Sequence, residues 1–189
     1  TTKKGCGINP STLEDNPEVP ISTQRDVDDA VEAAIAAGEL WAEVPVAERQ
    51  KAVIRFADAL SSLKDEFAVM LTKEQGKPLV FAKMEVDNAV RWLKGQAEIP
   101  FPEEVIEESD KHIVVTRYTA LGVALAIVPW NFPIMLACGK IAPSLIAGNA
   151  LILKPSPLTP YCGLKLAELA QAFFPPGVFQ ALSGDDSLG

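Results

Sequence analysis

The sequence predicts an α/β fold in which a helical N-terminal segment precedes a parallel β-sheet of which only the first strands are present. Before His112, apolar side chains recur at the three- and four-residue spacing of amphipathic helices. From Gly122 onward, short apolar runs alternate with helical stretches in the order β-α-β-α-β, which is half of a doubly wound, Rossmann-like domain. We therefore divide the chain into a helical segment (1–111), a linking strand (112–121) and a partial Rossmann-like half (122–189).

Four helices are expected in the first segment, each with its own start or stop signal. The first follows the capping sequence 22–26 and ends at Gly38, and the second begins after Pro45. The third covers about 63–74 and the fourth about 80–97.

The side chains of these helices are expected to divide into a core face and a solvent face. In the second helix, Arg49 falls outside the apolar stripe. In the fourth helix, five residues are expected to face a common core: Phe81, Met84, Ala89, Trp92 and Leu93. The acidic stretch 103–110 is interpreted as a turn, followed by a β-branched strand over 113–118.

The second half of the chain is predicted to contain three parallel strands and two connecting helices. The expected ranges are strand 122–128, helix 133–147, strand 150–153, helix 160–173 and strand 178–182. The first strand is an unbroken apolar run, so we expect it to be buried. A sheet that stopped at the third strand would leave an unpaired edge, which predicts further protein against it: a missing C-terminal part, a second copy or another subunit.

Composition excludes several classes of function. The net charge is −8, which disfavours nucleic acid, and no apolar run reaches the ~20 residues that span a bilayer. The three cysteines are odd in number and widely spaced, which fits neither a disulfide framework nor a zinc site, and we expect no metal. A reducing, cytoplasmic location is the simplest interpretation.

Several motifs in a fixed order resemble those of the NAD(P)-dependent aldehyde dehydrogenase superfamily. They are Pro129–Pro133, Ala147–Asn149 and Leu153–Ser156, accompanied by Asn9–Thr12, Glu74–Pro78 and Pro176–Phe179. The resemblance covers roughly Ile8 to Gly189, and it implies an aldehyde-dehydrogenase-type sheet that is incomplete in this chain.

The resemblance implies a role for particular side chains around the first strand end. Asn131 matches the asparagine whose amide holds the oxyanion, a task that needs a neutral donor fixed where negative charge develops. Lys140 is a second, catalytic candidate. Phe132 and Leu136 would line the substrate tunnel.

The cofactor implied is NAD or NADP. Its matching residues are Val128, Pro129, Trp130, Lys154, Ser156 and Gly184. In many members a glutamate three residues after the lysine also grips the ribose, but this chain has Pro157 there. That departure leaves the choice between NAD and NADP open and predicts poor binding by this chain alone.

In the family, the glycine-rich turn, the general-base glutamate and the nucleophilic cysteine all follow the position of Gly189. The sequence therefore predicts the front part of an enzyme that oxidises an aldehyde to a carboxylic acid, and this chain alone is not expected to carry out the oxidation. Two alternatives remain: a pseudoenzyme that pairs with a full-length relative, or a repurposed short enzyme with isomerase or cyclase chemistry in the pocket around Trp130, Asn131 and Lys140. For partners, we expect a homo-oligomer or association with the missing C-terminal part or a relative. Cys138 and Cys162 are interpreted as inert core residues.

Overall fold

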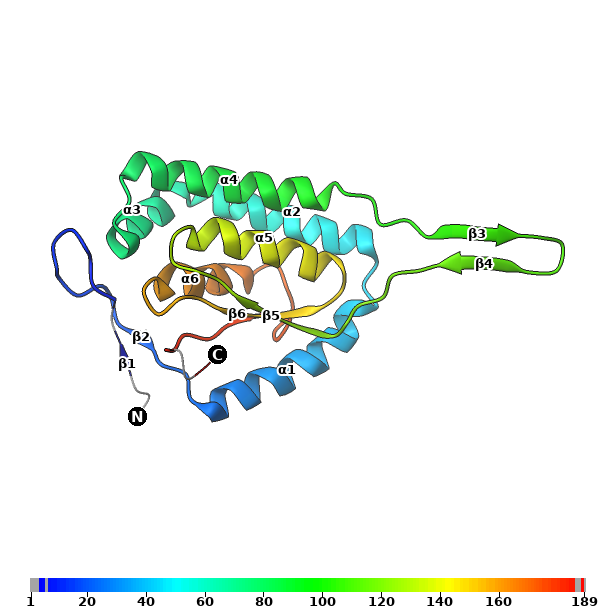
Figure 1. The fold of residues 1–189 in the computed structure, drawn as a ribbon, viewed down its shortest axis with the longest axis horizontal. Helices are drawn as coiled ribbons and strands as arrows, with labels where there is room; N and C mark the ends of the chain where they lie inside the picture. The colour runs from blue at the N-terminus through cyan, green and yellow to red at the C-terminus, as the bar shows by residue number, and fades with distance from the viewer. Residues whose placement is uncertain (1–3, 6, 186–187, 189) are drawn as a thin grey trace.

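The computed structural model describes residues 4–5, 7–185 and 188. It shows a layered body from which one β-hairpin projects far to the side (Figure 1). The helices are α1 (Gln24–Ala42), α2 (Val46–Ser62), α3 (Lys64–Gln75), α4 (Leu79–Ala97), α5 (Pro133–Ile146) and α6 (Pro160–Ala170). The strands are β1 (Lys4–Gly5), β2 (Val19–Pro20), β3 (Glu104–Glu108), β4 (Ile113–Thr116), β5 (Val123–Ile127), β6 (Ala150–Lys154) and β7 (Phe179–Ala181).

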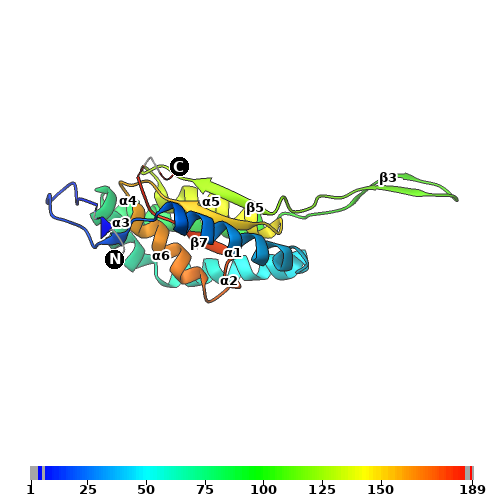
Figure 2. The same ribbon diagram turned by 90° about the horizontal axis from the view of Figure 1, so that it is seen from below.

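A three-stranded parallel sheet in the order β5-β6-β7 confirms the predicted β-α-β-α-β unit. Alternate residues of β6 face opposite sides of this sheet. Ala150 and Ile152 pack against Ala30 and Ala34 of α1, whereas the side chains between them join the core beneath α5 and α6. The sheet is therefore covered by α1 on one face and by α5 and α6 on the other (Figure 2).

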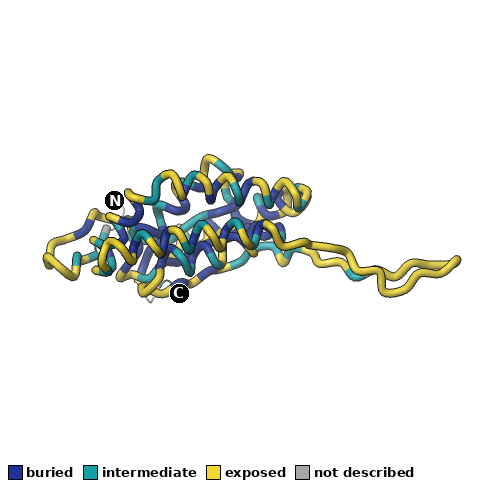
Figure 3. Tube along the Cα trace, turned by 90° about the horizontal axis from the view of Figure 1, so that it is seen from above, coloured by how far each residue is buried: buried dark blue, intermediate teal, exposed yellow. Residues whose placement is uncertain are grey.

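Helices α2, α3 and α4 form an outer layer that packs on α5 and α6. One hydrophobic core runs through both layers, and the buried positions lie along the middle of the body (Figure 3). No helix in the described part of the chain is long and apolar enough to cross a membrane.

Helix α1 starts as predicted and ends later than predicted. Thr23 and Asp26 form a capping box, in which the Thr23 side chain accepts a hydrogen bond from the Asp26 N–H. The predicted end at Gly38 is wrong, because the helix continues to Ala42. Gly38 is instead a buried contact point between α1 and β6: a Cβ there would lie 3.5 Å from the Cβ of Ala150, an ordinary van der Waals distance.

The prediction for the faces of α2 and α4 is partly wrong. Ala89 and Leu93 are buried, but Phe81, Met84 and Trp92 are 57%, 51% and 42% exposed and do not share the core. Arg49, expected on the outside, is buried.

The acidic stretch expected as a turn contains strand β3, which pairs antiparallel with β4 and carries a register shift between Val105 and Glu107. Both strands are almost wholly exposed because no other described element covers the hairpin (Figure 3).

Strand β5 also departs from its predicted burial. Leu125 and Ile127 are 62% and 59% exposed, since α1 covers the neighbouring strand more fully than it covers β5.

The turn before β7 gives a test of this packing. Gly177 has φ +86°, and a Cβ there would lie 2.8 Å from the carbonyl oxygen of Ala33 in α1. We expect Gly177→Ala to lower the free energy of unfolding by about 2 kcal/mol or more, through backbone strain and displacement of α1. The matched control is Gly95→Ala, where a Cβ meets nothing within 4 Å in helix α4. The control should be neutral or stabilising by up to ~1 kcal/mol in urea denaturation; equal effects of the two substitutions would contradict the packing described.

Candidate active site

The segments that carry the predicted site follow the carboxyl ends of the three parallel strands. Residues 128–133 follow β5, 154–156 follow β6 and 182–184 follow β7. Hydrogen bonds continue the sheet beyond its strands: Val128 N–H donates to the Lys154 carbonyl at 3.1 Å, and Leu182 N–H donates to the Leu153 carbonyl at 2.9 Å. Because the strands are parallel, the three segments meet at one edge, where open α/β sheets bind their ligands.

Asn131 lies in the turn between β5 and α5 and is exposed. Its Oδ1 accepts a hydrogen bond from the Phe132 N–H at 3.2 Å. The Asn131 carbonyl oxygen in turn accepts a hydrogen bond from Nζ of Lys77 at 2.9 Å. The same ammonium lies 4.3 Å from the centroid of the Phe132 ring. Lys77 therefore holds Asn131 and Phe132 through the Asn131 carbonyl and the Phe132 ring. Within the described residues the side-chain amide of Asn131 donates no hydrogen bond.

The support beneath this turn is a buried carboxylate from another helix. Glu85 of α4 is 2% exposed, and its Oε1 accepts hydrogen bonds from the N–H groups of Ile134 and Met135 at 2.9 and 3.2 Å. The first N–H groups of a helix have no partner within the helix, so the carboxylate satisfies two of them at the positive end of α5. The other Glu85 oxygen forms an ion pair with Lys77. Glu85 and Lys77 together hold both sides of the turn that carries Asn131.

A buried carboxylate also accepts hydrogen bonds from the first N–H groups of α6. Glu74, the last glutamate of α3, is 3% exposed and accepts hydrogen bonds from the N–H groups of Tyr161 and Cys162. Burial raises the pKa of Glu74, and the hydrogen bonds from Cys162 and Tyr161 oppose that shift only in part. Thr159 occupies the predicted N-cap position, but its side chain makes no capping hydrogen bond. The glutamate therefore takes over the capping role.

A buried arginine satisfies the opposite end of α5. Arg49 donates from Nε to the Ile146 carbonyl at 2.8 Å and from a guanidinium nitrogen to the Ala42 carbonyl at 2.9 Å. Trp41 donates its indole N–H to the Leu145 carbonyl at 2.8 Å. The guanidinium thus joins the C-terminal ends of α1 and α5, where free carbonyl groups favour a cation. Burial lowers the pKa of Arg49 from its usual value.

The predicted cofactor residues are grouped at the ends of β6 and β7. Lys154 is 7% exposed, and within the described residues no hydrogen bond or ion pair joins its ammonium to another side chain. Ser156 Oγ accepts a hydrogen bond from the Leu158 N–H at 3.2 Å, which shapes the turn that follows. Gly184 lines a cavity of about 150 Å³ together with Ser183 and Pro157. Lys154 and the cavity at Gly184 thus lie at the ends of neighbouring strands, and their part in cofactor binding stays a prediction.

Of the residues predicted to line the substrate tunnel or to act in catalysis, Leu136 and Lys140 lie on α5 and Phe132 is its N-cap. Phe132 is 44% exposed, Leu136 is half-buried and Lys140 is exposed. Within the described residues, no hydrogen bond or ion pair joins Lys140 to Asn131. The two candidates for catalysis are therefore separate in their contacts, and the role of each stays a prediction.

The buried cysteines are free thiols. Burial raises the pKa of Cys138, and it raises the pKa of Cys162 with further help from the negative charge of Glu74. A thiol with a raised pKa stays protonated and is a poor nucleophile. Cys6 lies outside the described residues. Within the described part of the chain, no three His, Cys, Asp or Glu side chains are grouped as a metal site.

Sequence reasoning missed Glu85 and Arg49 as members of the site. Glu85 lies at the helical spacing of Ala82, Val86 and Ala89, all buried, so a charged residue interrupts an apolar face. A carboxylate in such a position needs partners in the core, and that signal could have revealed it. Lys77 belonged to the motif Glu74–Pro78, but the motif alone assigned it no contact.

The fold and this edge of the parallel sheet define a class of protein: a doubly wound α/β protein with an asparagine, Asn131, just beyond the carboxyl end of β5. The aldehyde dehydrogenase family profile matches residues 2–189. The chain belongs to the aldehyde dehydrogenase family.

Individual relatives agree with this assignment. The aldehyde dehydrogenase LUC3 of a Fusarium species is 45% identical over 183 residues, which cover 97% of this chain and 38% of the relative. The betaine aldehyde dehydrogenase of Staphylococcus aureus, solved in complex with NAD+, superposes with a TM-score of 0.93 at 28% identity, covering 98% of this chain and 39% of that chain.

The NADP complex of glyceraldehyde-3-phosphate dehydrogenase GapN from Methanocaldococcus jannaschii gives a TM-score of 0.92 at 28% identity, with 98% and 42% of the two chains covered. The chain thus spans about two fifths of the length of the proteins it matches.

The Glu85 contacts predict a large effect of one substitution. Glu85→Ala should lower the free energy of unfolding by about 3–5 kcal/mol, because it removes the carboxylate that neutralises the Lys77 ammonium and leaves two N–H groups of α5 without a partner. Glu32→Ala on the exposed side of α1 is the control and should stay within about 0.5 kcal/mol of the parent in urea denaturation. A loss below ~1 kcal/mol for Glu85→Ala would show that the carboxylate does not support α5.

The raised pKa of Glu74 predicts a pH dependence. Between its ordinary value of 4.5 and its higher folded value, the folded state holds more protons than the unfolded state, so the Glu74 contribution to stability falls as pH rises. Glu74→Gln removes this contribution. As pH rises from 4.5 to about 8, the unfolding free energy of the parent should therefore fall relative to that of Glu74→Gln. A constant difference across this range would refute the shift.

Proposed function

We propose that this chain forms the front part of an NAD(P)-dependent enzyme that oxidises an aldehyde to a carboxylic acid. The observation that carries the proposal is the position of Asn131, in the turn that follows β5, whose last residue Ile127 pairs with Lys154 of β6. Within the described residues the side-chain amide of Asn131 donates no hydrogen bond, so it can donate to a ligand. Family membership gives the reaction class, and the relatives solved with NAD+ and NADP support a dinucleotide cofactor.

In this proposal, Asn131 stabilises the negative charge that forms on the aldehyde oxygen during attack by a nucleophile. A donor that is already oriented costs no reorganisation at that moment, which is why the Glu85 and Lys77 contacts matter to the chemistry. Phe132 and Leu136 form an apolar wall of the aldehyde channel, and Lys140 lies further along the same helix.

The dinucleotide, when bound, accepts the hydride. The Lys154 ammonium would hold its ribose hydroxyls, with Ser156 and Gly184 at the neighbouring turns and residues 128–130 along the channel. Pro157 is exposed and offers no carboxylate, so neither a ribose hydroxyl nor a 2′-phosphate is favoured there by charge.

The chain by itself is not expected to oxidise aldehydes. Cys138 and Cys162 are buried thiols with raised pKa values, so neither can supply the thiolate that the reaction needs. The open edge of β5 and its exposed Leu125 and Ile127 favour association with further protein, either the remainder of the enzyme or another subunit. The exposed hairpin of β3 and β4 offers a second surface for a homo-oligomer or a full-length relative.

The proposal is tested on the native protein by measuring its intact mass and then NAD(P)H formation with a mixture of aldehydes. We expect a mass well above 20.3 kDa and reduction of the cofactor. Asn131→Ala in the native protein should lower kcat by about 10²- to 10³-fold with little change in dinucleotide affinity, whereas Lys154→Met should raise the dinucleotide Kd by about 10-fold. Lys51→Met, on the exposed face of α2, is the control for Lys154. A native mass near 20.3 kDa without cofactor reduction would rule out the dehydrogenase.

A further inference from the structure

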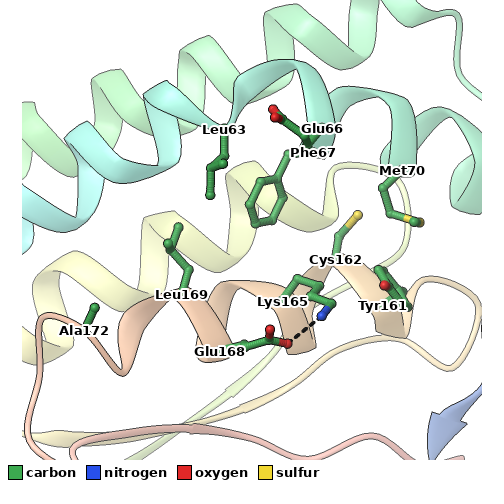
Figure 4. Close-up of a pocket in the computed structure, with 10 residues that line it drawn as sticks. All are labelled: Leu63, Glu66, Phe67, Met70, Tyr161, Cys162, Lys165, Glu168, Leu169 and Ala172. Atoms are coloured by element: carbon green, nitrogen blue, oxygen red, sulfur yellow. Dashed lines mark hydrogen bonds and ion pairs between the residues drawn. The ribbon is translucent and has the colours of Figure 1, made fainter.

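A groove of about 450 Å³ lies between α3 and α6, separate from the residues of the proposed active site. Its floor and walls are apolar: Leu63, Phe67 and Met70 come from the start and middle of α3, and Cys162 and Leu169 come from α6. Figure 4 shows Phe67 and Leu169 extending toward each other from the two helices, with the Cys162 sulfur directed toward α3. A mostly apolar recess of this size is typical of sites for small organic molecules.

Two of the charged groups at the rim form an ion pair with each other, and a third has no ion pair in the described part of the chain. Lys165 forms an ion pair with Glu168 at 2.6 Å and lies 5.6 Å from the centroid of the Tyr161 ring. Glu66 also lines the groove and has no ion pair within the described residues. The lining therefore carries two carboxylates and one ammonium, and that ammonium is already neutralised. The carboxylate left over is complementary to a positive charge on a ligand.

The chemistry of the walls limits how a ligand is held. Cys162 is fully buried, and burial, with the charge of Glu74 beside it, raises the pKa of its thiol, so it contributes an apolar surface rather than a covalent attachment. An ion pair at an exposed carboxylate contributes little affinity in water. The apolar body of a ligand must then supply most of its affinity, and the charge supplies the preference for one ligand over another.

We infer that the groove between α3 and α6 binds a small amphipathic organic cation, an amine whose aromatic or branched body fills the space between Phe67 and Leu169. The ammonium of the ligand pairs with Glu66 at the rim. This site is independent of the proposed dehydrogenase activity, because none of the proposed cofactor or substrate residues lines it.

The test is a titration of the ¹⁵N-labelled chain with 2-(2-naphthyl)ethylamine, followed by backbone amide shifts. The amine should produce saturable shifts confined to α3 and α6, with a Kd on the order of 1 mM. It should bind about 2- to 5-fold more tightly than 2-(2-naphthyl)ethanol, its neutral analogue, and 2-naphthylacetate should bind less tightly than either.

Two variants locate the site. Glu66→Gln should remove the preference for the amine over the alcohol, whereas the control Glu32→Gln on α1 should keep it. Ala172→Trp at the end of the groove should abolish the shifts by filling the space, and Ala36→Trp on the exposed face of α1 should leave them unchanged. Shifts outside α3 and α6, equal binding of amine and carboxylate, or undiminished binding by Ala172→Trp would each overturn the proposal.

Discussion

Three buried charges satisfy the backbone at the ends of the helices on which the sheet rests. Glu85 accepts from the first N–H groups of α5, Glu74 does the same for α6, and Arg49 donates to the last carbonyl groups of α5 and α1. Each of these side chains comes from the N-terminal helices, and each partner belongs to another element. The helical layer and the sheet layer are thus joined by directed polar contacts as well as by their shared apolar core.

This arrangement explains how a short turn can hold the backbone of Asn131 in one position. The turn at Asn131 lies on the surface, where loops are ordinarily mobile. Here it lies between the end of β5 and a helix start that Glu85 fixes, and Lys77 binds its carbonyl oxygen. Burying a carboxylate opposes stability, as the raised pKa of Glu74 shows, so these contacts favour one defined geometry at some cost in free energy.

Local signals in the sequence predicted much of this fold, and tertiary contacts decided the rest. The capping pair Thr23 and Asp26, the left-handed Gly148 and the parallel strand order follow from rules that involve few residues. The burial of Arg49 and the exposure of Leu125 depend on which element lies opposite, which helical periodicity does not encode. For the site, the motifs predicted the grouping at the sheet edge, but the contact between Glu85 and α5 joins residues 49 positions apart.

Amide hydrogen exchange at the start of α5 tests the central claim most directly. In the parent chain, the N–H groups of Ile134 and Met135 should be protected because Glu85 accepts their hydrogen bonds. In Glu85→Ala, we expect protection to be lost at these two amides and retained at Cys162, which Glu74 holds independently. Unchanged protection of Ile134 and Met135 in the variant would contradict the account, because the helix start would then be held without the buried carboxylate.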